Sequence, residues 1–276
     1  MKTKENNLAK RIYLNPSIEF ILIDNEISLA GVKLEYIFDN TRMITLNLYE
    51  GLRYKIFGEY YQQVNGNWSD VFVVGADVRH YQPIHRTLIW ANRFAISTSF
   101  GGSRLLYYMG GVDNWTNLSP QKIPTFDSSV PIDSTQSFVY QTIATNMRGF
   151  SQNIRNGNSF AVFNSELRWP IFRYFANRPI NSDFLNNFQL IGFVDIGTAW
   201  SGSSPWDKNN HLNNEVIKNG PLYIIIRKGN EPIVEGFGFG LRSRLLGYFV
   251  RTDWAWGIEN HVLLPRMFYL SLSLDF

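Results

Sequence analysis

The sequence of 276 residues contains no cysteine. Disulfide bonds, thiolate chemistry and cysteine-based metal sites are therefore excluded, whereas every cellular compartment stays open. Long apolar runs are also missing: no segment has 18 consecutive apolar residues, which excludes a transmembrane helix. The net charge is only +3 and the charges are interspersed, so nucleic acid is not an expected partner. The first twenty residues lack the apolar core of a secretory signal, so we expect any export signal to lie upstream.

Motifs for catalysis and ligand binding are equally scarce. The four histidines, His80, His85, His211 and His261, show no zinc spacing, and no G-x-S-x-G elbow of a serine hydrolase occurs. The GFGFGLR stretch has no helical pattern after it and does not predict a nucleotide site. We therefore expect no metal, no cofactor and no enzymatic activity.

Aromatic residues, by contrast, make up 16% of the chain, a proportion typical of β-structure and of the aromatic belts of membrane proteins. From about residue 28, apolar and polar residues alternate with the period of a strand. The pattern predicts about nine strands, with a partial tenth at 16–23. The nine segments are 28–39, 51–64, 70–82, 86–99, 161–170, 188–200, 234–246, 249–258 and 266–276.

The length and polarity of these segments favour a membrane barrel. A globular strand usually has about 5 to 6 residues, whereas a strand needs roughly 9 to 11 to cross a bilayer. One face of each segment is apolar and the other carries charges of both signs, as the hydrated interior of a barrel does; Phe163 and Leu167, for example, oppose Glu166 and Arg168. A soluble β-sandwich stays open as an alternative, because a single amphipathic strand fits both cases.

The connections between the segments alternate in length. Those near 82–86, 171–186 and 246–248 fall on one side, and those at 65–69, 100–156, 201–232 and 260–264 fall on the other. Outer-membrane barrels have short periplasmic turns, long extracellular loops and a periplasmic C-terminus. This alternation places 100–156 and 201–232 outside the cell.

Four motifs then occur in order along the chain. They are MRGF at Met147–Phe150, NSELRWPI at 164–171, GFVDIGTAW at 192–200 and GFGLRSRLLGYFVRTDWAWGI at 238–258. With these motifs and an aromatic C-terminal strand, residues 28–276 resemble the C-terminal part of the barrel of the BamA/TamA-type outer-membrane assembly and translocation superfamily, the bacterial surface antigens. Two departures are Met147 in place of a β-branched residue and a turn, SRLLGY, without its usual proline.

The resemblance implies an all-β fold: an antiparallel transmembrane β-barrel, of which this chain supplies about 9–10 strands of a family total of sixteen. Residues 1–27 would be an N-terminal lead-in and 28–276 the barrel segment. Within it, 100–156 would be an extracellular lid loop that folds into the lumen. An open sheet of this size leaves two unpaired edges, so we expect a fragment, a truncated product or a barrel completed by a partner.

The resemblance also implies a role for the MRGF motif, Met147, Arg148, Gly149 and Phe150, as the tip of the lid. Arg148 would contact two carboxylates on the lumen wall, Glu166 and Asp195. A guanidinium binds carboxylates bidentately, Gly149 permits a tight turn or close approach, and Phe150 would fill a gap against the wall. We expect the lumen-facing Gly238 and Gly240 to leave room for the tip. The alternatives are a plain surface turn and solvated lumen charges.

The C-terminal segment has a second expected role. Tyr269, Ser271, Leu274 and Phe276 have the spacing of the terminal signal by which outer-membrane clients are recognised, although ordinary alternation in an edge strand gives the same pattern. The family resemblance predicts a non-enzymatic insertase that folds β-barrel clients into the bacterial outer membrane. Expected partners are outer-membrane lipids, unfolded β-barrel clients, accessory lipoproteins and upstream periplasmic domains. The alternatives are a translocation pore of the same superfamily and a structural or receptor barrel.

Overall fold

The computed structural model describes residues 2–5, 25–65, 69–116, 124–133, 136–207, 210–219, 222–227 and 229–276. Most of them belong to one thirteen-stranded antiparallel sheet, which confirms the all-β class. Its path runs through β1 (Lys2–Glu5), β2 (Asn25–Asp39), β4 (Leu48–Gln63), β5 (Asp70–His85), β6 (Leu88–Phe100), β11 (Ser159–Trp169), β12 (Gln189–Trp200), β15 (Val234–Leu245), β16 (Tyr248–Glu259), β18 (Met267–Ser271) and β8 (Trp115–Thr116). β3 (Arg42–Thr45) pairs with β4, and β17 (Val262–Leu263) with β16.

All nine predicted strands are present in this sheet. Eight of them match the predicted bounds within a few residues, because alternation marks a strand wherever one face is buried. The ninth is shorter: the expected strand 266–276 ends at Ser271. The partial strand expected at 16–23 lies outside the described residues, as does most of the lead-in 1–27. The sheet path ends at β1 and β8, which do not pair with each other in the described part of the chain, so the sheet is open there.

The two faces of the sheet have inverted polarity. We call the face beneath the 100–156 segment the inner face and the opposite one the outer face. Of the largest fully buried side chains, four are arginines, and Arg168 and Arg242 among them lie on the inner face of β11 and β15. The outer face leaves large apolar side chains exposed, including Leu167 and Val194 at more than two fifths of their surface. A protein folded in water usually buries its large apolar side chains and exposes its charged ones.

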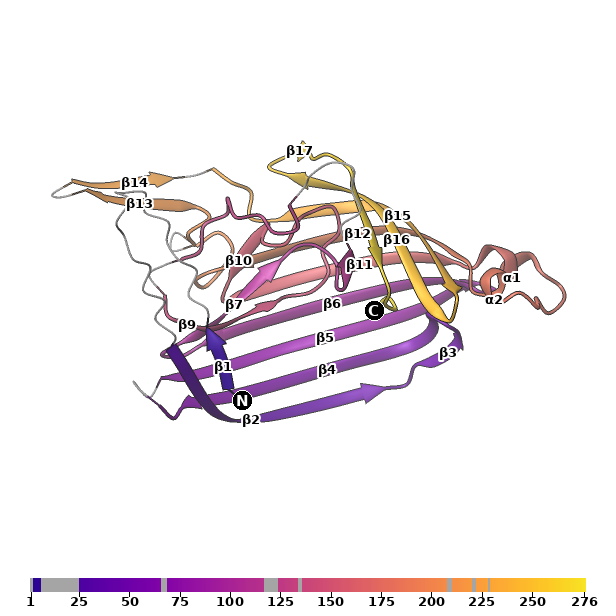
Figure 1. Cartoon of the computed structure of the whole chain (residues 1–276), viewed down its shortest axis with the longest axis horizontal. Helices are drawn as coiled ribbons and strands as arrows, with labels where there is room; N and C mark the ends of the chain where they lie inside the picture. The colour runs from indigo at the N-terminus through magenta and orange to yellow at the C-terminus, as the bar shows by residue number, and fades with distance from the viewer. Residues whose placement is uncertain are drawn as a thin grey trace.

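A second, smaller sheet covers the inner face near the long connections. It joins β10 (Arg155–Gly157), β7 (Arg104–Met109) and β9 (Phe138–Ile143), so described parts of the 100–156 segment form strands where the alternation predicted only a loop. Figure 1 shows β7 and β10 lying against the large sheet. Tyr107 and Met109 of β7 pack in one apolar cluster with Val71, Phe160 and Val162 of the large sheet. The fold therefore brings this segment back onto the inner face.

The short and long connections lie at opposite ends of the long strands, as Figure 1 shows. The short end, hereafter the short-turn rim, carries α1 (Ile171–Phe175) and α2 (Asp183–Asn186) between β11 and β12. The opposite end carries the hairpin of β13 (Asn214–Asn219) and β14 (Leu222–Arg227). No helix in the described ranges is long and apolar enough to cross a membrane.

Candidate functional site

Arg148 lies at the centre of a buried charge cluster on the inner face. Its Nε and Nη2 donate to the two carboxylate oxygens of Asp195 at 2.7 Å each, and its Nη1 donates to Oε1 of Glu166 at 2.6 Å. The guanidinium also stacks on Phe193, 3.6 Å from the ring centroid. All three charged side chains are at most 2% exposed. The expected contact of Arg148 with both carboxylates is therefore present, in the bidentate geometry that a guanidinium fork permits.

The strands position the two carboxylates by register. Glu166 belongs to β11 and Asp195 to β12, and both face inward because inner and outer residues alternate along each strand. Asn164 pairs with Asp195 in the ladder and donates its Nδ2 to Oδ1 at 2.8 Å. Burial opposes a charged guanidinium, but Asp195 and Glu166 outweigh it and raise the pKa of Arg148 well above its ordinary value. The tip therefore keeps its charge at any pH at which the protein folds.

Gly149 adopts a left-handed backbone conformation, with φ of 95°. A side chain there would collide with the backbone of Trp256 and Gly257, so the position requires glycine. The sheet has no side chains at the point where the tip docks. A Cβ on Gly236 would strike the carbonyl of Arg148, and one on Gly257 would strike Gly149 and Phe150. Gly236 and Gly257 are cross-strand partners, so together they form a notch for the tip.

The expectation that Gly238 and Gly240 make this room is wrong. A Cβ on Gly238 would meet Trp254 and Phe193, and one on Gly240 would meet Asp253 and Arg242, so the atoms nearest to either glycine belong to the wall and not to the tip. The alternation correctly placed both on the inner face. It could not show how far along the strand the tip docks, because that distance depends on the path of the loop.

Tyr269, on β18, holds the tip in place. Its hydroxyl accepts from the backbone N–H of Gly149 at 2.9 Å and donates to the carbonyl of Phe150 at 2.8 Å. Its ring meets Trp115 edge to face, with centroids 4.8 Å apart. Both tip residues would otherwise present unsatisfied buried backbone groups. Sequence analysis assigned Tyr269 to a terminal signal, whereas the structure places it at the site.

The charge cluster continues from the tip to the C-terminal residues. Glu166 also accepts from Nε of Arg168 at 2.9 Å, and Arg168 donates to the carbonyl of Phe276 at 3.0 Å and lies over its ring. Asp275 accepts from Nε of Arg242 at 2.8 Å. With Asp253 and Arg251, the cluster contains four arginines and four carboxylates: Arg148, Arg168, Arg242, Arg251, Glu166, Asp195, Asp253 and Asp275. The charges balance, which buried ions require.

The C-terminal segment leaves the sheet after Ser271, contrary to the expected strand. Tyr269 and Ser271 are buried on the inner side, Leu274 is exposed, and Phe276 packs beside Leu48 and Tyr81. Of the four residues expected to form a terminal signal, Tyr269 and Ser271 thus lie in β18, and Leu274 and Phe276 lie beyond its end; the signal itself stays a prediction. The physical reason for leaving the sheet is the polar anchor at Asp275, whose backbone N–H donates to Oδ1 of Asn47 at 2.9 Å and whose carboxylate binds Arg242.

Asn47 was missed by sequence reasoning, yet it is fully buried in the turn before β4. Its carbonyl accepts from Arg168 at 3.0 Å and its Nδ2 donates to Asp275 at 2.8 Å. Asn47 has φ of 65°, a left-handed turn that asparagine tolerates well. A short polar segment carries no periodic pattern, so only that turn chemistry was available as a signal.

The cluster joins two parts of the same chain, the loop and the sheet, through ion pairs and hydrogen bonds. No group of three or more metal-ligating side chains stands together within the described ranges. The groups at the tip are a guanidinium, two carboxylates and a phenol. The arrangement therefore serves to lock a loop against a sheet.

Comparison with known proteins leaves the chain without an assigned family. No model of a protein family matches it, and no curated protein matches it.

Proposed function

We propose that this chain is part of an outer-membrane barrel of the BamA/TamA type that folds and inserts β-barrel clients. The observation that carries the proposal is the inverted polarity of the sheet, with balanced charges buried on one face and large apolar side chains exposed on the other. An outer face with Phe94, Leu167, Val194 and Phe239 exposed is unfavourable in water and favourable against lipid. In this arrangement the short-turn rim and the C-terminus face the periplasm.

The lid is the second line of support. The Arg148–Gly149–Phe150 tip is held by two carboxylates, a glycine notch and Tyr269, which is what a loop returning into a barrel requires. A plain surface turn has no need of a fully buried arginine, because desolvating that charge costs several kcal/mol unless it is paired. The lid keeps the interior closed and organised between clients.

The edges of the sheet are the working surface in this proposal. β1 pairs with β2 only as far as Ser28, so residues 29–39 present an edge with no partner among the described residues. At the other end, β8 covers β18 only at Leu270 and Ser271. Unpaired edges template an incoming strand by β-augmentation, and closing the barrel needs further strands. No cofactor or nucleotide takes part.

Insertion of a β-barrel client into liposomes tests the proposal. We expect Arg148→Glu to abolish insertion, because it sets a third carboxylate against Asp195 and Glu166. Tyr269→Phe provides a gentler variant that keeps every charge, and we expect it to slow insertion. Arg53→Glu, at an exposed position of β4, is the matched control.

A folded Arg148→Glu variant that inserts clients at the unaltered rate would overturn the proposal. A translocation pore is the alternative outcome of the same experiment. It would give single-channel conductance blocked by its substrate, with no client insertion. A structural or receptor barrel would give neither insertion nor a substrate-dependent block.

A further inference from the structure

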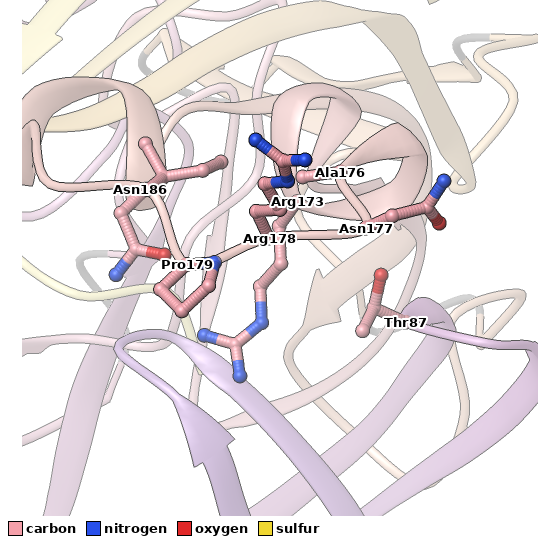
Figure 2. A pocket seen from close by; sticks show the side chains of 8 residues that line it. Thr87, Arg173, Ala176, Asn177, Arg178, Pro179 and Asn186 are labelled. Carbon is pink, nitrogen blue, oxygen red and sulfur yellow. The ribbon is translucent and has the colours of Figure 1, made fainter.

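Two hollows lie near the short-turn rim, and the charged side chains of the buried cluster line neither of them. The first is a cavity of about 510 Å³ between the turn after β5 and the α1 to α2 connection. Figure 2 shows its lining side chains, which include Arg173, Arg178, Asn177 and Thr87; the two guanidinium groups point to opposite sides in this view. Its volume lies in the range of small-molecule sites.

The chemistry of this cavity selects for an anion. Two arginines, two asparagines and Thr87 line it, and no carboxylate does. The acidic residue of α2, Asp183, lies instead beside Arg244 at 3.5 Å. The hydroxyl oxygen of Thr87 is buried and has no hydrogen-bond partner in the described part of the chain. A buried hydroxyl without a partner is uncommon in proteins, and here it accompanies two guanidinium groups that form no ion pair with a described residue.

The second hollow is an apolar groove of about 320 Å³ on the outer face. Ile84, Trp90, Leu167 and Val194 line it around Gly192. Trp90 pairs with Leu167 and Leu167 with Gly192 in the strand ladders, so the groove crosses from β6 to β12. No side chain fills its floor, because nothing lies within 4 Å of a Cβ built on Gly192.

The two hollows are close in sequence, because Thr87 lies in the turn just before β6 and Trp90 lies on β6. Thr87 of the cavity precedes Trp90 of the groove by three residues, roughly 10 Å of strand. The α1 to α2 segment lies over the outer face at this rim: α2 covers Ser243, whose hydroxyl donates to the carbonyl of Phe184 at 2.7 Å. Phe172 and Phe175 of α1 are exposed there, as aromatic residues are at a membrane interface.

We propose that the short-turn rim binds one anionic phospholipid, with its phosphate in the cavity that Arg173 and Arg178 line and an acyl chain in the groove at Gly192. This inference rests on the proposed membrane location and adds a specific lipid site to it. Guanidinium groups bind phosphate through charge-assisted hydrogen bonds, and the groove supplies the apolar contact that a free phosphate cannot use.

Native mass spectrometry of the full chain in a non-ionic detergent tests the proposal. The probes are dioleoyl-phosphatidylglycerol, dioleoyl-phosphatidylcholine and inorganic phosphate. We expect one bound phosphatidylglycerol, with weaker binding of phosphatidylcholine and no competition from inorganic phosphate at equal concentration. Each lost charge-assisted contact should weaken binding roughly tenfold, so Arg173→Gln with Arg178→Gln should remove most of it.

Matched variants separate the two hollows. Gly192→Leu should fill the groove and weaken phosphatidylglycerol binding several-fold without disturbing the fold. Gly58→Leu is its control, because Gly58 also has an open environment but lies on β4, outside the groove. Arg244→Gln controls for loss of a charge at the same rim.

The outcomes that would overturn the lipid site are distinct. Equal binding of phosphatidylcholine, full competition by inorganic phosphate, or undiminished binding by the double arginine variant each contradicts it. A chain that enters the detergent phase and inserts clients but binds no phosphatidylglycerol refutes the lipid site alone. A chain that partitions into the aqueous phase refutes the proposed membrane function as well.

Discussion

Glu166 and Leu167 are neighbours on β11 and have opposite environments. The carboxylate is 1% exposed among arginines, and the leucine is 43% exposed on the outer face. The same contrast holds along β12, where Asp195 is fully buried and Val194 is 46% exposed. The inner face stabilises charge because every ion has a partner, and the outer face exposes apolar surface. Polarity alone thus does not decide which residues are buried; the partners available on each face do.

The strongest test of this contrast removes the central cation of the inner face. Arg148→Ala should destabilise the protein by about 3–5 kcal/mol, because Asp195 loses its bidentate partner while buried. The exposed Arg53→Ala should change stability by no more than about 0.5 kcal/mol. Denaturant unfolding followed by tryptophan fluorescence measures both. Equal losses in the two variants would mean that the inner cluster is not the stabilising feature described above.

The outer face is tested by placing a charge on it. Val194→Arg, at mid-strand, should cost about 2–4 kcal/mol in lipid vesicles if this face meets hydrocarbon. Tyr248→Arg, at the short-turn rim, should cost no more than about 1 kcal/mol, since the penalty falls toward the interface. Urea unfolding in vesicles gives both values. Similar small costs at both depths would indicate an outer face in contact with water.

Removing the hydroxyl of Tyr269 tests the contribution of a single buried polar group on the inner face. Tyr269→Phe leaves the N–H of Gly149 and the carbonyl of Phe150 without that partner, which should cost about 1–3 kcal/mol. Tyr60→Phe on the outer face removes only an exposed bond to Gln62, so stability should hardly change. Hydrogen exchange at Gly149 supplies a local readout. Unchanged protection there in Tyr269→Phe would show that the hydroxyl does not hold the tip.

The smallest expected effect is a loss of stability at low pH. Burial would raise the pKa of Asp275, but Arg242, Arg251 and Arg168 outweigh it and hold the pKa well below its ordinary range. Because its pKa is lower in the folded protein, the Asp275 carboxylate stabilises the fold fully at any pH above its pKa in the unfolded chain, about 3.9. This stabilisation decreases as the pH falls from there toward the pKa of the folded protein. Stability measured from pH 6 to pH 3 should therefore decline below about pH 4.

Asp275→Asn should flatten that decline, whereas Asp113→Asn, at an exposed position, should leave it in place. The slope of unfolding free energy against pH is the measured quantity in each case. An unaltered slope in Asp275→Asn would assign the acid sensitivity to other carboxylates.

Part of the site was predictable because alternation reports the face of each residue. Glu166 and Asp195 were assigned to the inner face from their strands alone, and the MRGF motif identified Arg148 as their partner. Tyr269 and Asp275 were also on the correct face, but sequence analysis gave Asp275 no role and did not connect Tyr269 with the tip. A tyrosine hydroxyl that caps a loop more than a hundred residues away leaves no mark in local sequence.

By itself, the sequence determined the eight long strands, the polarity of their two faces and the arginine of the tip, because these depend on a period of two residues and on side-chain chemistry. Only the tertiary structure decided where the tip docks, which glycines make room for it, and that the chain leaves the sheet after Ser271. Those outcomes depend on contacts such as Asn47 with Asp275, 228 residues apart. No local pattern specifies such pairs, since they form only when segments far apart in the sequence meet on the inner face of the folded sheet.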